Sequence, residues 1–198
     1  MGIEQRFESF NSQIVDSDEF LSKPGWYGVG ELDIGRLATL PSRELLRKLP
    51  WLLNEFDDPC EVGIVRRKGI WFIFKTAEFY NRVEFTPRDS EVWIHSHPAW
   101  ENAPLDGINF SLPSTSDFVY CLDDARNFVA SQEGLTEYWP IMMDGERMER
   151  ARLSKIITDM GIGDTHSEYL RLLNGVGARL QLYKWEELTP EKLTELLS

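Results

Sequence analysis

The pattern of hydrophobic and polar residues changes near residue 60, from helical spacing to the short runs of strands. Before this point a helix is predicted over residues 42–56. Its large apolar side chains recur every three or four positions: Leu45, Leu46, Leu49, Leu52, Leu53 and Phe56. Ser42 is suited to cap the start of this helix, and Pro50 is expected to bend or split it. Asp57-Asp58-Pro59 is expected to end it.

After residue 60 the pattern predicts mainly strands. We expect strands at residues 61–65, 70–74, 82–85 and 91–96, with a hairpin turn at residues 66–69. The run 70–74 is apolar at every position, which is typical of a strand buried on both faces. A helix over residues 118–125 and a hairpin of strands 127–131 and 135–139 follow.

The C-terminal part is predicted to be mainly helical. We expect helices at residues 146–160 and 166–174, a strand at 178–185, and a last helix with Pro190 at its first position. At the other end, residues 1–24 are interpreted as a polar extension that packs on the surface or is partly disordered. Residues 26–40 have too little periodicity to assign. This order of elements predicts the α+β fold class.

Composition narrows the classes of function. The 198 residues carry a formal net charge of −12, which argues against a nucleic-acid partner because such partners need a basic face. Two cysteines, Cys60 and Cys121, indicate a reducing compartment rather than a disulfide framework. The N-terminus lacks the basic and apolar regions of a signal peptide, and no apolar run reaches the roughly 18–20 residues that cross a membrane. We therefore expect a cytoplasmic protein without a membrane partner.

The candidate chemistry lies in residues 91–117. His95 and His97 are two positions apart on a predicted strand, so their side chains point to the same face. Pro98 ends that strand because it has no N–H for a ladder. Two imidazoles at a strand end, with a carboxylate folding back toward them, form a three-ligand set that zinc accepts while keeping a fourth position for water.

The motif His95-Ser96-His97-Pro98, followed by Pro113-Ser114 and Asp117 and preceded by Glu61, resembles the JAB/MPN domain family. Within that family it is similar to the metalloproteases with the JAMM motif. The resemblance covers roughly residues 42–140. It implies a JAB/MPN fold, which is cytidine-deaminase-like, with a central mixed β-sheet flanked by helices. The chain then divides into an N-terminal extension (1–40), a catalytic core (41–145) and a C-terminal part (146–198) packed on it.

The resemblance also implies a role for each motif residue. His95, His97 and Asp117 look like the ligands of one catalytic zinc ion, and Glu61 looks like the general base. Ser114 is similar to the serine that donates a hydrogen bond to the oxyanion of the tetrahedral intermediate. These roles agree with physical chemistry, since zinc brings a bound water to a pKa near 7 and a partly desolvated glutamate is suited to proton transfer.

By this resemblance the chain is a zinc-dependent isopeptidase or protease that hydrolyses the bond after the C-terminal tail of a ubiquitin-like protein. Its expected partners are that protein or its conjugate, and E1-like and E2-like enzymes of a bacterial conjugation system. One alternative is a non-enzymatic MPN-type binding or scaffold module. Another is a different metal-dependent hydrolase on the same fold, such as a deaminase or a relative of the RadC group, although that group typically has His-Asn-His-Pro.

One spacing departs from the family pattern. Asp117 comes 20 positions after His97, where the pattern usually has eleven, so the intervening loop is nine residues longer. Asp106 or Glu101 within that loop could replace Asp117 as a ligand. We favour Asp117 because it follows Pro113-Ser114 at a predicted helix start. The added residues are expected to form a lid or a substrate-binding element.

Other residues of the same types compete with these assignments. Glu55, Glu84 and Glu91 are alternatives to Glu61, but Glu55 falls inside the predicted helix and Glu91 on the histidine strand itself. His166 is the only histidine outside the motif and is expected to lie on a helix surface or to cap a helix. The basic cluster 66–68 is interpreted as a solvated turn.

Overall fold

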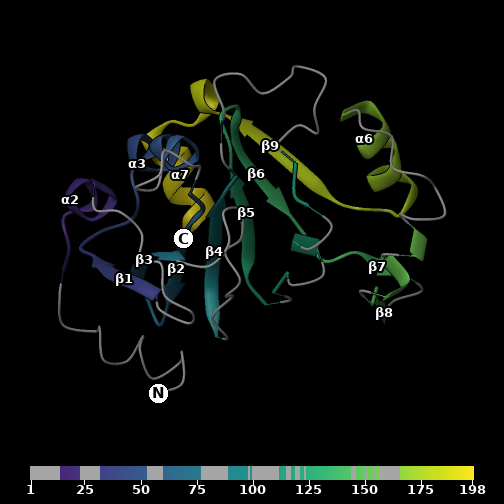
Figure 1. The fold of residues 1–198 in the computed structure, drawn as a ribbon, viewed down its shortest axis with the longest axis horizontal. Helices are drawn as coiled ribbons and strands as arrows, with labels where there is room; N and C mark the ends of the chain where they lie inside the picture. Colours follow the sequence, from purple (N-terminus) through teal and green to yellow (C-terminus); the bar gives the residue numbers. More distant parts are fainter. Residues whose placement is uncertain are drawn as a thin grey trace.

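The computed structural model describes residues 14–22, 32–52, 60–76, 89–97, 99, 112–114, 117–118, 121–122, 124–143, 146–149, 151–153, 155–156 and 166–198. Within this part of the chain, seven strands form one mixed sheet in the order β1-β3-β2-β4-β5-β6-β9 (Figure 1). The strands are β1 Leu32–Leu37, β2 Val62–Arg67, β3 Ile70–Thr76, β4 Ser90–Ser96, β5 Arg126–Ala130, β6 Gly134–Tyr138 and β9 Leu180–Lys184. A separate ribbon pairs β7 Met142–Met143 with β8 Glu146–Arg147.

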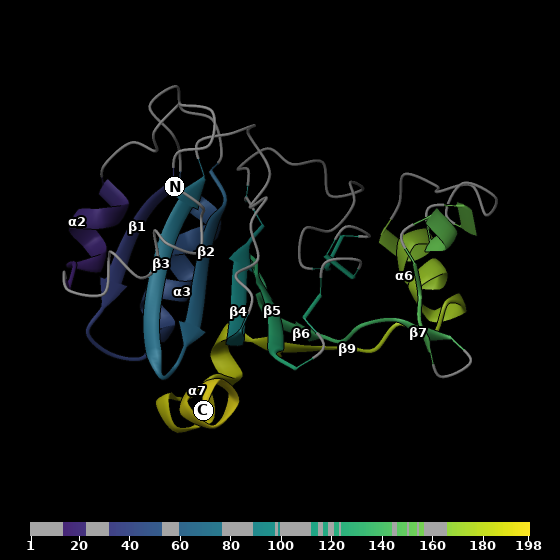
Figure 2. The same ribbon diagram turned by 90° about the horizontal axis from the view of Figure 1, so that it is seen from below.

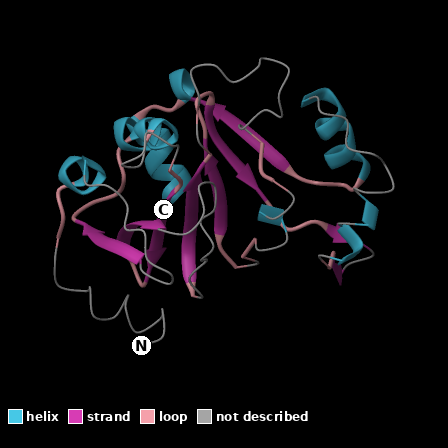
Figure 3. Cartoon of the chain, viewed as in Figure 1, coloured by secondary structure: helices cyan, strands magenta, loops and turns pink. Residues whose placement is uncertain are grey.

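Helices flank this sheet, so the fold is of the α+β class. They are α2 Ser17–Ser22, α3 Arg43–Lys48, α6 His166–Gly175 and α7 Pro190–Leu197, with the 3-10 turns η1 Leu49–Trp51 and η2 Trp185–Glu187. Figure 3 shows α2, α3 and α7 toward the β1 side of the molecule and α6 beyond the opposite side. A search of the described helices finds none that is both long enough and apolar enough to span a membrane.

Strand β4 occupies the middle of the sheet and is held on both sides. It pairs antiparallel with β2 and parallel with β5. The parallel ladder continues past its end, because the N–H of His97 donates to the carbonyl of Ala130 at 2.8 Å. The C-terminal end of β4 therefore has a fixed path, which matters because both motif histidines lie there.

The two faces of the sheet bury different sets of side chains. One face of the sheet packs against α2, α3 and α7 (Figure 2). Its cluster includes Val62, Ile64, Val92, Ile94 and Phe128 from the strands, Leu45 and Leu46 from α3, and Leu193, Leu196 and Leu197 from α7. The other face carries Val65, Phe72, Phe74 and Trp93, and further along it Val129 and Tyr138. Since side chains alternate along a strand, His95 falls on this second face with Trp93.

Helix α7 is capped at its N-terminus and bonded to the sheet near its C-terminus. Thr189 caps the first turn by accepting a hydrogen bond from the N–H of Lys192, and Pro190 occupies the first helical position as predicted. At the other end, Arg66 and Arg126 from the sheet donate to carbonyls near the helix C-terminus, each at 3.3 Å. These contacts place cations where the helix dipole favours them.

Most predicted elements are confirmed, with shifted ends. The predicted helix at 42–56 begins after its cap Ser42 and ends at Lys48, where the 3-10 turn η1 with Pro50 replaces it; Leu52 is already extended. The rest of the prediction, including the stop at residues 57–59, lies outside the described residues. The apolar strand β3 is buried on both faces, as expected. Its hairpin with β2 turns at Lys68 and Gly69, whose φ values of 49° and 75° are those of a type I′ turn. The predicted strand 82–85 lies outside the described residues.

The predicted helix over residues 118–125 is wrong over its second half. Cys121, Leu122, Asp124 and Ala125 are not helical. The side-chain amide of Asn127 donates to the carbonyls of Leu122 and Ala125 and accepts from the N–H of Leu122, at 2.9–3.1 Å. These bonds satisfy the backbone groups that a helix would have used, so a loop is stable here.

Two further differences concern the ends of the chain. Strand β1 forms within the segment left unassigned, and it completes one edge of the sheet by pairing with β3. Residues 146–147, predicted as the start of a helix, instead form β8, and helical residues follow at 151–153 and 155–156. At the opposite edge β9 pairs with β6, so residues from the C-terminal part belong to the main sheet.

Gly63 offers a test of how this second face is packed. It pairs with both His95 and Phe74, and an added Cβ would lie 2.7 and 2.8 Å from two ring atoms of the fully buried Phe74. We predict that Gly63→Ala lowers the free energy of unfolding by about 1–3 kcal/mol, as overpacked core sites do. Urea denaturation measures this loss.

Gly69→Asn is the matched control for that variant. Gly69 has a φ of 75°, but a Cβ there would meet nothing within 4 Å. Asparagine adopts left-handed conformations more readily than other side chains, so the expected loss is smaller than for Gly63→Ala. Equal losses for both variants would contradict this account of the packing.

Candidate metal centre

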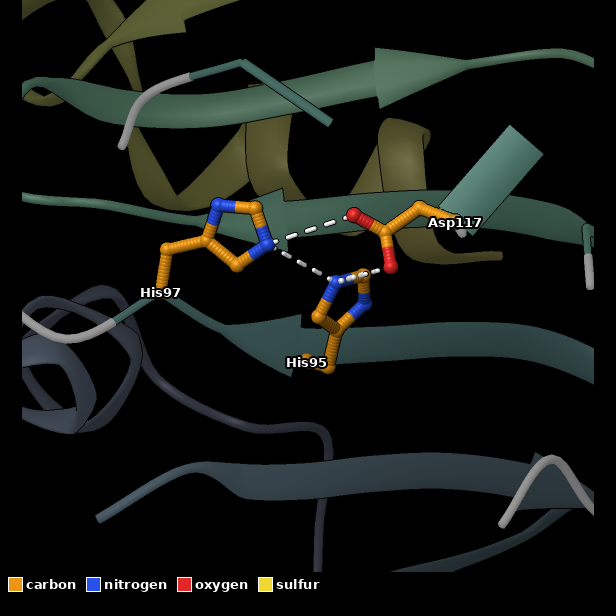
Figure 4. A group of neighbouring side chains, drawn as sticks. All are labelled: His95, His97 and Asp117. Carbon is orange, nitrogen blue, oxygen red and sulfur yellow. Dashed lines mark hydrogen bonds and ion pairs between the residues drawn. The ribbon is translucent and has the colours of Figure 1, made fainter. Parts of the chain in front are cut away.

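Three predicted site residues converge at the end of β4. The Nε2 atoms of His95 and His97 are 3.2 Å apart. The carboxylate of Asp117 lies against both, with Oδ1 3.2 Å from Nε2 of His95 and Oδ2 3.3 Å from Nε2 of His97 (Figure 4). Within the described part of the chain, these are the residues whose His, Cys, Asp or Glu donor atoms come close enough together to hold a metal ion.

The neighbours of His95 fix the direction of its ring. The indole of Trp93 stacks against it with ring centroids 6.0 Å apart, and Tyr138 from β6 meets it edge-on at 6.2 Å. All three side chains are buried. Because β4 is also bonded to a strand on each side, the imidazole has little freedom to turn away from Asp117.

A tight turn that begins at Ser114 positions the carboxylate. The N–H of Ser114 donates to Oδ2 of Asp117 at 2.6 Å, and the N–H of Asp117 donates to the Ser114 hydroxyl at 3.3 Å. The N–H of Asp117 also lies 3.1 Å from the carbonyl of Ser114. This reciprocal arrangement has the bonding of a capping box, with serine first and a carboxylate three residues later.

The electrostatic balance of the site keeps Asp117 ionised. Its side chain is 17% exposed. Burial raises the pKa of this carboxyl, but the charge and hydrogen bonds of His95 and then His97 outweigh burial and hold the pKa well below its usual range. Asp117 is therefore a carboxylate at neutral pH, the form that binds metal ions.

The three donors lie close enough to share one metal ion, since one ligand atom from each residue lies within 4.8 Å of the others. The two Nε2 atoms are 3.2 Å apart, close to the roughly 3.3 Å between tetrahedral ligand atoms of zinc, which bonds to nitrogen and oxygen at about 2.0–2.1 Å. Each imidazole faces a different carboxylate oxygen, with Oδ1 3.2 Å from His95 and Oδ2 3.3 Å from His97. Two imidazoles and one carboxylate also match the donor sets of catalytic zinc sites. The residues present therefore fit a bound metal ion, whose identity the distances do not select.

The two remaining predicted site residues are both among the described residues. Ser114 is exposed and belongs to the same turn as Asp117. Glu61 is half-buried and directly precedes β2. Gly63 pairs with His95 at the end of the antiparallel ladder, and the same register continued for two residues beyond it would put Glu61 opposite His97. Opposite residues in such a ladder present their side chains to one face, so Glu61 starts on the face of the metal ligands.

Competing residues are placed elsewhere or lie outside the described ranges. Glu91 is near the start of β4, where it pairs with Arg66 at 2.8 Å and accepts from the N–H of Gly69. It is therefore at the end of β4 that is remote from the histidines. His166 is the first residue of α6. The alternatives Glu55, Glu84, Glu101 and Asp106 lie outside the described residues.

Sequence reasoning gave no role to Ser96, between the two histidines. Its side chain must point to the opposite face, where it is fully buried. There its hydroxyl accepts a hydrogen bond from the N–H of Val62 at 2.9 Å. Since Val62 follows Glu61, Ser96 joins the histidine strand to the segment that carries the predicted base. The sequence signal for this role was a polar residue between the two histidines, at the position that faces away from the metal ligands.

No protein-family model, curated protein or solved structure matches this chain. The site is therefore interpreted from its own geometry and from the motif resemblance.

Metal binding is the first property of this site to test. We predict that the purified protein binds about one equivalent of Zn²⁺ and that Asp117→Ala lowers the affinity by at least about 100-fold, because one of three protein ligands is lost. Competition with a chromophoric chelator measures the affinity. Zinc at 100 times its dissociation constant should stabilise the wild type by about 2.7 kcal/mol.

His166→Ala is the control for this experiment, because it removes the one histidine that lies outside the motif. Its zinc affinity should equal that of the wild type. A wild-type protein that shows no zinc-dependent stabilisation would contradict the assignment.

Ser96 gives a second prediction. Ser96→Ala leaves the buried N–H of Val62 without its acceptor, which should cost about 1–3 kcal/mol of unfolding free energy. Ser22→Ala removes an exposed hydroxyl that donates to the carbonyl of Glu19, and should change stability by less than about 0.5 kcal/mol. Chemical denaturation of the two variants compares them directly, and an unchanged Ser96→Ala would refute the linking role of this hydroxyl.

Proposed function

We propose that the protein is a zinc-dependent isopeptidase of the JAB/MPN type, which hydrolyses the bond after the C-terminal tail of a ubiquitin-like protein. The observation that carries this proposal is the convergence of His95, His97 and Asp117, which offer ligand atoms within 4.8 Å of one another. The seven-stranded mixed sheet with flanking helices is compatible with that fold. The substrate class comes from the motif resemblance.

A zinc ion bound here would supply a Lewis acid that polarises the scissile carbonyl and makes water more acidic. The carboxylate of Glu61 would accept the proton of the attacking water and deliver it to the leaving amine nitrogen. Its half-buried position directly before β2 suits this task, because it is partly shielded from bulk water and still accessible. In this scheme neither cysteine acts as a nucleophile.

Ser114 would assist by donating its hydroxyl proton to the developing oxyanion. Its oxygen already accepts the N–H of Asp117, so the hydroxyl is oriented while its own proton stays available for donation. Ser114 is exposed, whereas Asp117 in the same turn is largely buried. The turn thus presents one side chain to the ion and the other to a substrate.

Two observations bear on the alternative functions and on the cellular compartment. A non-enzymatic binding module would gain nothing from a buried carboxylate held between two imidazoles, so the retained group favours an enzyme. Cys60 and Cys121 are buried and not joined in a disulfide. This supports a reducing compartment such as the cytoplasm, where E1-like and E2-like partners of a conjugation system would also act.

The proposal predicts a separation of metal binding from catalysis. Glu61→Gln should bind zinc as the wild type does but lower kcat by about 10²–10⁴-fold, because the amide cannot accept the proton. The assay is cleavage of ubiquitin and related small proteins fused through their C-terminal tails to a reporter. Ser114→Ala should lose about 10²–10³-fold in kcat.

Glu91→Gln provides the matched control, since Glu91 lies at the other end of β4 and pairs with Arg66. It should cleave at the wild-type rate. If Glu61→Gln cleaves as fast as the wild type, or if the zinc-loaded wild type cleaves no fusion in the set, the proposed function is refuted.

A further inference from the structure

A tyrosine from α6 contacts the turn that positions the metal ligand. Tyr169 is 4% exposed, and its hydroxyl donates to the carbonyl of Pro113 at 2.6 Å. The two residues are 56 positions apart in sequence. Tyr169 also lies beyond residues 42–140, where the motif resemblance ends, so no role for it follows from that resemblance.

The peptide group between Pro113 and Ser114 is bonded at both ends. Its carbonyl accepts from Tyr169, and its N–H donates to Oδ2 of Asp117 at 2.6 Å. A peptide group is planar, so the tyrosine that fixes the direction of the carbonyl also fixes the direction of the N–H. The bonds also run in one direction, from phenol through peptide to carboxylate, and bonds in such a chain polarise one another.

Packing supports the same connection. One hydrophobic cluster joins Leu112, Phe118 and Cys121, which flank the turn, with Tyr169, Leu172 and Leu173 of α6. Tyr138 belongs to this cluster too, and its ring lies 5.6 Å from that of Phe118 and 6.2 Å from that of His95. The turn is therefore held between α6 and the face of the sheet that carries the histidines.

The hydroxyl of Tyr169 is in the form that this role requires. Burial raises its pKa, and the nearby charge of Asp117 raises it further. It remains a protonated donor throughout the neutral range. Loss of the hydroxyl would leave the carbonyl of Pro113, itself a buried residue, without this donor.

We propose that Tyr169 is a positioning residue of the metal centre, which orients the Pro113–Ser114 peptide and through it the carboxylate of Asp117. Helix α6 thus supports the metal site through the Pro113–Ser114 peptide, although it contributes no ligand itself. The proposal concerns metal binding and rests on the proposed function only where activity is measured. If the wild type binds zinc but cleaves no fusion, the proposed function fails while this inference can still be tested.

The test compares Tyr169→Phe with Tyr183→Phe in the full chain. Each variant deletes one hydroxyl and keeps the ring. Tyr183 is the matched control, because its hydroxyl donates to Glu137 at 3.1 Å and its side chain packs against the other core cluster, under α7. Zn²⁺ affinity is measured by chelator competition, and the ligand geometry by the visible absorption spectrum of the Co²⁺-loaded protein.

We expect Tyr169→Phe to lower Zn²⁺ affinity by about 10–100-fold, the usual effect of losing a partner that orients a ligand. Its Co²⁺ spectrum should differ from that of the wild type, and with an active enzyme kcat should fall more than KM rises. Tyr183→Phe should keep the wild-type affinity and spectrum, whatever its effect on stability. Wild-type affinity and spectrum in Tyr169→Phe, or equal changes in both variants, would overturn the proposal.

Discussion

The site depends on placing an ionised carboxylate in a largely buried position between two imidazoles. An uncompensated charge there would cost several kcal/mol, so every polar group around Asp117 must compensate for lost hydration. The histidines and the N–H of Ser114 do so at 2.6–3.3 Å. The two Nε2 atoms, 3.2 Å apart, also require a positive centre or a shared proton near them. The arrangement favours a cation at the point where the three donors meet.

The sheet makes the close approach of the two imidazoles possible because it fixes the path of the end of β4. A free strand end would let the imidazoles separate and relieve their mutual repulsion. Here β2 and β5 pair with β4 along both sides, and the ladder with β5 continues to His97. Ser96, on the opposite face, adds a bond to the first residue of β2. The two imidazoles are therefore held close together by hydrogen bonds of the backbone and of Ser96, in which the rings themselves take no part.

Local sequence pattern predicted the parts of the fold whose cause is local. The apolar run of β3, the turn at Lys68 and Gly69, the cap of α3 and the start of α7 at Pro190 all follow from neighbouring residues. Strand β1 was not predicted, because its place depends on pairing with β3. The second half of the helix predicted at 118–125 does not form, because a side chain from β5, that of Asn127, bonds the backbone into a loop.

The same distinction applies to the site. The histidines could be predicted because strand alternation puts residues two apart on one face, and the structure brings Asp117 to them. The roles of Ser96, Tyr138 and Tyr169 could not, because each depends on a contact between elements far apart in sequence. Metal binding, and the catalytic roles of Glu61 and Ser114, stay predictions.

The long interval between His97 and Asp117 is consistent with a ligand that is positioned by the hydrogen bonds of its own turn. In general, the closure entropy of a chain segment grows slowly with its length, by only about 0.6 kcal/mol for each doubling. An interval of 20 positions instead of eleven is less than one doubling. A single intramolecular hydrogen bond contributes about 1 kcal/mol, so the bonds from Tyr169 and from the N–H of Ser114 are sufficient to offset that cost. Where a turn is anchored from both α6 and the sheet, the number of residues leading to it does not have to be conserved for the ligand to reach its place.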